Sequence, residues 1–284
     1  MSSGQSIEPV PPVTRQSAHI YVMIRAAKRA ARGLVRDFGE GEQLQGSQKG
    51  PADFVSIADT RAERTLYEEL SHARPGYGFL MEESGAKAGT DPDHRWLVDP
   101  LDGTANFLHG IPHFCISIGL QREDEVIAGV IYDPVKDETF WADKGLGAFL
   151  NDRRLRVSAR RNMNEAVIAT GIPFLGREGH RPFLAEMESV MAQVAGIRRF
   201  GAAALDLAYV AAGRFDGFWE SGLEPWDMGA GIIIVREAGG FITDLDGGDS
   251  MLTKGTIAAS NVNLHKPLLD LLGEARRQHQ PLPA

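Results

Sequence analysis

The stretch Trp96–Leu120, which reads WLVDPLDGTANFLHGIPHFCISIGL, limits what this chain can fold into more than any other part. Residues 96–98 form a short apolar run that is typical of a buried strand. Pro100 cannot donate to a sheet ladder, and it biases the residue before it away from the helical region. We therefore expect the strand to end at Asp99.

Asp102 follows shortly after, and the next two residues are Gly103 and Thr104. Gly103 permits a close approach of the backbone, and Thr104 suits the start of a short turn over 105–108. Free backbone N–H groups at such a start suit a phosphate, and neighbouring carboxylates suit a divalent cation. A plain structural turn is the alternative, because Asp-Pro and Asp-Gly pairs are common in turns. An EF-hand loop is excluded, because no Glu stands at its twelfth position.

The size and charge of the chain exclude several classes of protein. Its 284 residues suffice for one large or two small domains. A net charge of −8 argues against a general nucleic-acid binder, and no apolar run is long enough to span a membrane. Residues 1–16 lack the pattern of a secretory signal, and we expect them to form a disordered tail. The single cysteine, Cys115, precludes an internal disulfide and favours a reducing compartment, so we expect a cytoplasmic location.

The N-terminal part combines helical spacing with a carboxylate before a helix. Apolar residues recur at helical intervals over 17–38, and the Gly- and Gln-rich segment 39–52, which contains Lys49, reads as a mobile loop. After a short strand at 54–57, Asp59 precedes a second helix over 60–74. Asp59 is therefore either an N-cap or a catalytic residue.

Strands dominate the middle of the chain. The strand 78–81 runs into Glu82 and Glu83, as 96–98 runs into Asp99, so two strand ends could deliver carboxylates to one edge of a sheet. Turn residues then separate further apolar segments, which predicts an antiparallel meander. Its strands are expected at 114–121, 126–132, 138–142 and 147–150.

From about residue 162 strands and helices alternate, which predicts a largely parallel sheet covered by helices. Strands are expected at 166–170, 197–200, 215–219, 241–243 and 257–259, and helices at 181–195, 205–212, 227–238 and 264–278. The chain thus divides into an α+β half (17–160) and an α/β half (161–279), with the boundary near 155–165. In the second half Glu220 follows a strand, and Asp227 stands at or near the N-cap of a helix, where a plain cap is the alternative reading.

Three motifs occur together: Glu82-Glu83-Ser84, then Asp99-Pro-Leu-Asp102-Gly-Thr104-Ala-Asn106-Phe107, then Trp226-Asp227 before Gly229-Ala-Gly231. In this order and approximate spacing they resemble the inositol monophosphatase family, over roughly residues 17–275. The segment 199–213 looks like the substrate-side segment of bacterial inositol-1-monophosphatases. The resemblance implies the layered αβαβα sandwich of the inositol monophosphatase and fructose-1,6-bisphosphatase type.

The resemblance also implies a binding site for Mg²⁺. One ion would be held by Glu82, Asp99 and the backbone carbonyl of Leu101. A second would be held by Asp99, Asp102 and Asp227, and a weaker third would lie near Glu82. Oxygen ligands agree with what Mg²⁺ prefers, and paired ions suit in-line phosphoryl displacement.

The remaining roles are carried over in the same way. Thr104, oriented by Asp59, would position the attacking water, and Lys49 would lie beside the metal site. The implied catalytic residues are Glu82, Thr104 and Asp59. The implied substrate-side residues are Asp102, Gly103, Thr104, Gly201, Ala202, Ala203, Glu220 and Asp227. At Ala202 some members carry a small hydroxyl residue, which puts substrate detail in doubt.

The function expected is Mg²⁺-dependent, lithium-sensitive hydrolysis of a phosphate monoester, with myo-inositol 1-phosphate first among small phosphorylated polyols. Fructose 1,6-bisphosphate, histidinol phosphate and 3′-phosphoadenosine phosphates are alternative substrates. A regulatory protein that binds RNA-processing or transcription machinery is the alternative of another class. A homodimer is implied by the resemblance alone.

Overall fold

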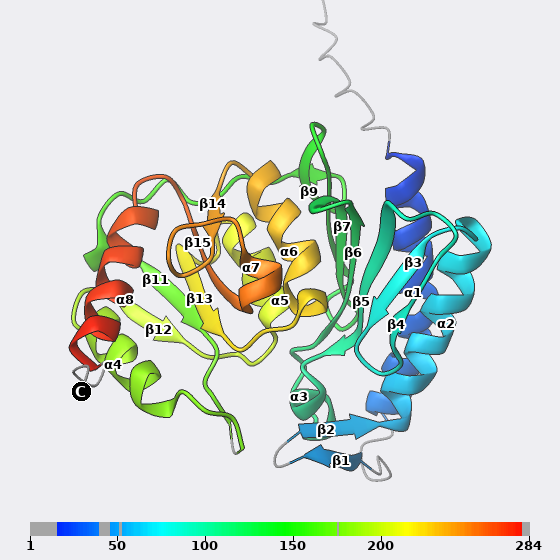
Figure 1. The fold of residues 1–284 in the computed structure, drawn as a ribbon, viewed down its shortest axis with the longest axis horizontal. Coiled ribbons are helices and arrows are strands. Elements are labelled where there is room, and N and C mark those ends of the chain that lie inside the picture. Colours follow the sequence, from blue (N-terminus) through cyan, green and yellow to red (C-terminus); the bar gives the residue numbers. More distant parts are fainter. Residues whose placement is uncertain (1–15, 40–45, 51–52, 175, 280–284) are drawn as a thin grey trace, which may run out of the picture.

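The computed structural model describes residues 16–39, 46–50, 53–174 and 176–279 (Figure 1). The helices are α1 (Ala18–Gly39), α2 (Ile57–Ala73), α3 (Thr104–Leu108), α4 (His180–Met191), α5 (Ala203–Ala211), α6 (Pro225–Glu237), α7 (Met251–Lys254) and α8 (His265–His279), with a 3₁₀ turn at Met163–Glu165. The strands are β1 (Gly46–Gly50), β2 (Asp53–Ser56), β3 (Gly78–Met81), β4 (Gly85–Lys87), β5 (His94–Asp102), β6 (Cys115–Arg122), β7 (Glu125–Asp133), β8 (Glu138–Asp143), β9 (Gly147–Leu150), β10 (Arg153–Arg154), β11 (Val167–Thr170), β12 (Gly196–Arg198), β13 (Gly217–Ser221), β14 (Phe241–Thr243) and β15 (Thr256–Ser260).

The larger sheet has eight strands in the order β10-β9-β8-β7-β6-β5-β3-β4. Helices α1 and α2 cover one of its faces, where Ile20, Met23 and Leu34 of α1 are buried against it (Figure 1). These residues recur at the spacing of one helix face, which is why the periodicity predicted this helix correctly. Strands β5 to β9 pair antiparallel in succession, so the predicted meander is confirmed.

The smaller sheet has five strands in the order β12-β11-β13-β15-β14. Only the pairs of β11 with β12 and with β13 are parallel, while β15 runs antiparallel to both of its neighbours. The prediction of a largely parallel sheet was therefore wrong for this edge. The return strand β15 follows the short helix α7 instead of a full crossover helix, so it need not run parallel.

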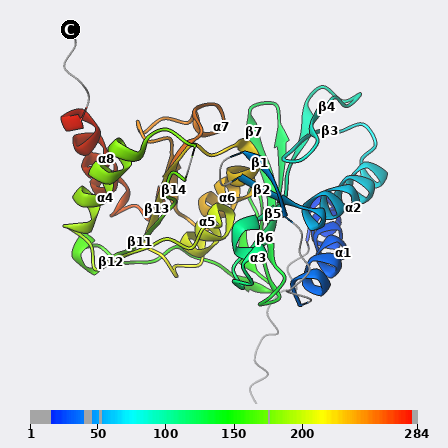
Figure 2. The same ribbon diagram turned by 90° about the horizontal axis from the view of Figure 1, so that it is seen from below.

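Helices α5 and α6 form the layer between the two sheets, and α4 and α8 cover the outer face of the smaller sheet (Figures 1 and 2). The core around α5 and α6 joins Leu97 and Ile131 of the larger sheet to Phe218 and Ala259 of the smaller one. The layers therefore alternate as αβαβα, as expected. A boundary near 155–165 stays a prediction, since this middle layer packs on both sheets.

Several element ends differ from the predictions because tertiary pairing overrides local signals. Strand β5 does not end at Asp99 but continues to Asp102, with an irregular register against β6 that accommodates Pro100. Within the segment predicted as a mobile loop, β1 pairs with β2, while residues 40–45 and 51–52 lie outside the described part.

Asp59 and Asp227 both lie in the first turn of a helix, but neither is the N-cap residue itself. Helix α2 begins at Ile57, so Asp59 lies inside its first turn and is fully buried. Helix α6 is capped by Glu224, and Asp227 is the N3 partner of that capping box. Within the described residues, no helix is both long and apolar enough to cross a bilayer.

Candidate active site

Strands β3 and β5 bring the first two carboxylates together. They run parallel, with Met81 opposite Val98, so their carboxyl ends lie at the same sheet edge. The Glu82 N–H donates to Val98 O at 3.2 Å, which places Glu82 beside the residue that precedes Asp99. Glu82, directly after β3, therefore lies next to Asp99 within β5, although Asp99 is not the end of its strand as predicted.

The start of α6 brings Asp227 to the same edge. A Cβ on Gly229 would lie 2.6 Å from Leu97 Cδ1, so glycine at this position lets the helix approach β5 without displacing the Leu97 side chain. The Ser117 hydroxyl, directly opposite Asp99 in the sheet, donates to Trp226 O at 3.2 Å. The small residues noted in this helix therefore hold it against the strand that carries Asp99.

The carboxylates at this edge repel one another. Asp99 is only 2% exposed, and burial raises its pKa well above the ordinary value. The negative charges of Glu82, Asp102 and Asp227 raise the pKa of Asp99 further. Burial and the charge of Asp102 raise the pKa of Asp227 to about 7, and burial raises the pKa of Asp102 to about 6. Glu82, Asp102 and Asp227 are thus all within electrostatic reach of Asp99.

A divalent cation fits this donor set. The ligands available are carboxylate and carbonyl oxygens, which Mg²⁺ prefers, and the surplus negative charge is what a cation neutralises. Among the described residues, no three His, Cys, Asp or Glu side chains are close enough together to coordinate one metal ion as they stand. A bound ion would therefore have to draw carboxylates from several elements to one point, and it would replace the hydrogen bond that Asp99 shares with Glu82.

The hydroxyl of Thr104 connects the loop to α2. It lies 3.0 Å from Asp59 Oδ1 and 3.0 Å from Leu101 O. Leu101 N–H in turn donates to Asp99 Oδ1 at 2.9 Å. Thr104 is the first residue of α3, and Gly103 before it has φ 94, which glycine adopts without strain. Asp59 and Thr104 are therefore in contact, as expected from the resemblance.

Asp102 faces the first turn of α5. Its Oδ2 accepts the Ala204 N–H at 2.8 Å, and further N–H groups of this turn lower the pKa of Asp102 against the effect of burial. Gly201 before the helix has φ 80, and Ala202 is the N-cap residue. The backbone at the predicted substrate-side residues 201–203 thus lies next to Asp102 and is partly held by it.

Glu220 lies in β13 and points to the same side. A Cβ on Gly171 would lie 1.8 Å from Glu220 Oε1, so the carboxylate rests directly on the Gly171 backbone. Burial and the charges of Asp227 and Asp102 raise the pKa of Glu220 to about 8. The guanidinium groups of Arg199 and Arg177 oppose this rise in the pKa of Glu220.

Lys49 lies in β1, but its side chain is outside the described part of the structure. Its predicted place beside the metal site therefore stays a prediction.

Two further residues were not predicted to have a role. Asp206 on α5 is 1% exposed, and its Oδ1 has no hydrogen-bond partner among the described residues. Burial and the charge of Glu220 raise the pKa of Asp206 well above its usual range. Asn106 Nδ2 donates to His113 O and to Phe200 O, both at 2.8 Å, and so ties α3 to the segment before α5. Both lie within motifs that were noted, but neither carries a pattern that separates it from core residues.

Comparisons with known proteins agree with this arrangement. The inositol monophosphatase family matches residues 16–280. The inositol-1-monophosphatase of Mesorhizobium japonicum is 58% identical over 89% of this chain and 96% of its own length. The Nus factor SuhB of Escherichia coli K12 is 41% identical over 87% of this chain and 93% of its own length.

A solved structure is also similar throughout. The crystal structure of the extragenic suppressor protein SuhB from Bartonella henselae has a TM-score of 0.88 at 58% identity, covering 90% of this chain and 98% of that one. The match thus includes the strands, the loop and the helix that carry the acidic residues. The chain belongs to the inositol monophosphatase family and is a phosphatase.

Proposed function

We propose that this phosphatase hydrolyses a phosphorylated polyol in the presence of Mg²⁺, with myo-inositol 1-phosphate as the preferred substrate. The observation that carries the proposal is the gathering of Glu82, Asp102 and Asp227 around Asp99, next to the Thr104–Asp59 contact. Relatives named inositol-1-monophosphatase support the choice of substrate.

The acidic residues would hold two or three ions. Glu82, Asp99 and the Leu101 carbonyl form one set of ligands, and Asp102 and Asp227 join Asp99 in the other. Bound Mg²⁺ supplies a water of lowered pKa and neutralises charge on the phosphoryl oxygens. Asp99 belongs to both sets, so it is the residue on which binding depends most.

The chain's own groups position the reactants. With its proton donated to Asp59, the Thr104 hydroxyl oxygen can accept a hydrogen bond from the attacking water. As the water attacks, its proton would pass to the Thr104 oxygen while the Thr104 proton passes to Asp59. The backbone N–H groups of Gly103 and Thr104 would donate to a phosphate oxygen.

The polyol would lie between α5 and β13. The Glu220 carboxylate would accept hydrogen bonds from hydroxyl groups, and the segment Gly201 to Ala203 would form the facing wall. Hydroxyl recognition by a buried carboxylate discriminates strongly, because a substrate without that hydroxyl leaves the carboxylate unpaired.

A substrate panel tests the proposal. Phosphate release would be measured for myo-inositol 1-phosphate, fructose 1,6-bisphosphate, histidinol phosphate and 3′-phosphoadenosine 5′-phosphate, with Mg²⁺ and with a chelator. We expect the highest kcat/KM for the inositol ester by at least about 10-fold, and loss of turnover in chelator, as for a metal-activated water. A comparable preference for another ester would replace the substrate, and full turnover in chelator would refute the metal ligands.

A second function is favoured by the similarity to the Nus factor SuhB. We propose as the alternative that the chain also binds transcription machinery. Capture of RNA polymerase subunits by the Asp99→Asn, Asp227→Asn double variant, at the level of the unmodified protein, would support binding without catalysis. Failure of both proteins to capture them would reject it.

The finer properties are proposals supported by the family alone. They are lithium sensitivity, a homodimer and a cytoplasmic location. Light scattering at working concentration tests the dimer, and phosphate release over a lithium titration tests the inhibition.

A further inference from the structure

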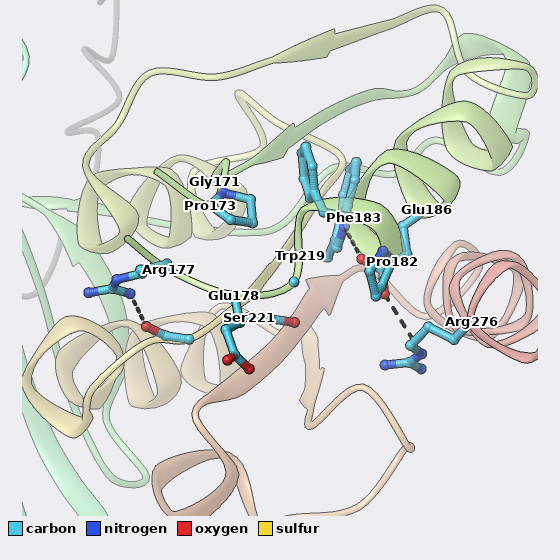
Figure 3. Close-up of a pocket in the computed structure, with 12 residues that line it drawn as sticks. Gly171, Pro173, Arg177, Glu178, Pro182, Phe183, Glu186, Trp219, Ser221 and Arg276 are labelled. Carbon is cyan, nitrogen blue, oxygen red and sulfur yellow. Dashed lines mark hydrogen bonds and ion pairs between the residues drawn. The ribbon is translucent and has the colours of Figure 1, made fainter. Parts of the chain in front are cut away.

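A cavity of about 230 Å³ is lined by residues of β13, of α4 and of the segment before α4 (Figure 3). It lies on the face of β13 opposite the Glu220 side chain. Strands β11 and β13 are parallel neighbours, with Thr170 opposite Trp219, so their carboxyl ends open at the same edge of the smaller sheet. Ligands of open α/β sheets bind outside such strand ends. The cavity is closed on its other side by the start of α4 and by Arg276 of α8.

Only a thin wall separates the cavity from the proposed substrate side. Side chains alternate along a strand, so Trp219 and Ser221 line the cavity while Glu220 points to the other face. Gly171 lines the cavity too, and the Glu220 carboxylate rests on its backbone. A molecule in the cavity would therefore press on the residue that supports Glu220.

One end of the cavity is lined by the Glu186 carboxylate and the Arg276 guanidinium (Figure 3). Glu186 is 4% exposed; its Oε2 accepts the Trp219 Nε1–H at 3.2 Å, and its Oε1 lies 3.8 Å from Arg276 Nε. Arg276 Nη2 donates to Leu245 O at 2.6 Å. An arginine carries five N–H donors, so Arg276 retains donors for a further acceptor.

The mouth of the cavity is also lined by an arginine and a glutamate, Arg177 and Glu178. Arg177 is exposed, donates through Nη1 to Gly222 O, and stacks over the Phe174 ring at 4.4 Å. It too retains donors. Glu178 stands exposed at the mouth and disfavours a second negative charge on any occupant. The walls between the two arginines are apolar and are formed by Pro173, Pro182, Phe183 and Trp219.

We propose that this cavity binds a small organic monoanion with a ring or a branched apolar body, and that its occupancy alters how Glu220 meets the substrate. The anionic group pairs with Arg177 or Arg276, and the apolar body packs on Trp219 and Phe183. The volume equals that of roughly eight waters, which limits the occupant to a small metabolite. The effect on Glu220 rests on the proposed function, whereas the binding does not.

Calorimetry with phenylacetate tests the binding on the full chain, and neutral 2-phenylethanol is the matched probe. We expect phenylacetate to bind one to one with a Kd of about 1 mM or tighter, and the alcohol at least about 10-fold more weakly. Equal affinities would overturn the assignment of the arginines. No binding of phenylacetate would overturn the site.

Two variants of residues that line the cavity test whether phenylacetate binds there. Ser221→Leu fills the cavity and Arg177→Gln removes the charge at its mouth, so we expect both to weaken binding at least about 5-fold. Arg181→Gln is the control, because Arg181 is exposed on α4 and does not line the cavity. Binding that is equal in all three variants would place the probe elsewhere and reject the proposal.

The coupling has its own measurement. With saturating phenylacetate we expect KM for the inositol ester to change at least about 3-fold, while kcat for p-nitrophenyl phosphate, which lacks polyol hydroxyls, stays constant. Binding without any change in KM would reject the coupling and leave the site. Absence of turnover on every ester would reject the proposed function and leave the binding result standing.

Discussion

The Thr104 hydroxyl lies 3.0 Å from Asp59 Oδ1, although 45 positions separate the two residues. Asp59 is fully buried in the first turn of α2, and Thr104 begins α3. A structural contact that holds the start of α3 and a proton transfer from the Thr104 hydroxyl are the two explanations of this contact.

Replacing Asp59 separates these explanations. Asn serves as well as Asp near a helix start, so a structural role predicts an unchanged protein for Asp59→Asn. A general base predicts a loss in kcat of about 10²- to 10⁴-fold with little change in Tm. Thr104→Ser keeps the hydroxyl and should retain most activity, while Thr104→Val should not. Steady-state kinetics with melting curves distinguishes the two; wild-type kcat in Asp59→Asn would contradict the assignment.

Asp99→Asn tests the metal ligands. Asp99 stands in both proposed ligand sets, and the amide cannot supply the negative charge that a cation needs. We expect kcat to fall by at least about 10²-fold, the scale of losing an electrostatic stabiliser of the transition state, and the Mg²⁺ concentration for half-maximal rate to rise. Phosphate release over a Mg²⁺ titration measures both. Turnover near that of the unmodified protein would refute the ligand set.

The pH dependence of stability without metal follows from the raised pKa values. Asp227 keeps its proton in the folded state up to about pH 7, whereas in the unfolded chain it ionises near pH 3.8. Below about pH 4 it is protonated in both states. Between about pH 4 and 7 the folded state holds more protons, so the free energy of unfolding falls as pH rises. Bound Mg²⁺ favours the ionised folded form and should remove this loss.

Melting curves in chelator check the sign. Asp227→Asn cannot ionise, so its Tm relative to the unmodified protein should rise steadily from pH 4 to pH 7, and saturating Mg²⁺ should reverse the order at pH 7. Asp124→Asn, at an exposed position of a turn, is the matched control and should show no such trend. A Tm difference independent of pH would mean that Asp227 is not destabilised by its neighbours.

The sequence predicts element types well and their ends poorly, for physical reasons. Periodicity reports which faces are buried, so α1 and the meander could be predicted. The ends of helices and strands depend on backbone pairing with distant segments, which the local sequence does not indicate. Pro100 suggested a strand end, yet β5 passes through it by an irregular register with β6. Asp227 was predicted at or near an N-cap, and it is the N3 residue of a helix whose N-cap is Glu224.

The candidate site divides in the same way. The acidic motifs mark residues that chemistry needs, and the structure brings Glu82, Asp99 and Asp227 to one sheet edge. Asp206 and Asn106 could not be singled out, since their roles arise from contacts across the fold. Asn106 meets Phe200 from 94 positions away, a distance that no spacing argument covers.

Asn106→Ala should therefore destabilise the protein and disturb the substrate side. Two partly buried carbonyls, of His113 and Phe200, would lose their donor, and each lost hydrogen bond costs about 0.5–1.5 kcal/mol. We expect a lower Tm and a raised KM, because the segment before α5 is released. Asn162→Ala removes an exposed hydrogen bond to Glu165 and should leave both unchanged. Denaturant unfolding and kinetics on the two variants would show the difference, and equal stabilities would contradict the bridging role.

Asp206 offers a test in which stability and function move in opposite directions. Its carboxyl is buried beside Glu220 and Asp102, and its raised pKa means that the folded state resists ionisation. In the unfolded chain Asp206 ionises above about pH 4, while in the folded state it keeps its proton. The free energy of unfolding therefore falls as pH rises above about 4. Asp206→Asn should therefore match the unmodified Tm near pH 4 and exceed it near pH 8. If the acid is kept because its protonated carboxyl contributes to the surroundings of Glu220, the same variant should raise KM for the inositol ester several-fold, while kcat for p-nitrophenyl phosphate stays the same. A higher Tm for Asp206→Asn with unchanged KM would mean that Asp206 has no role in substrate binding. A lower Tm for this variant at high pH would mean that the Asp206 carboxylate is stabilised in the folded state.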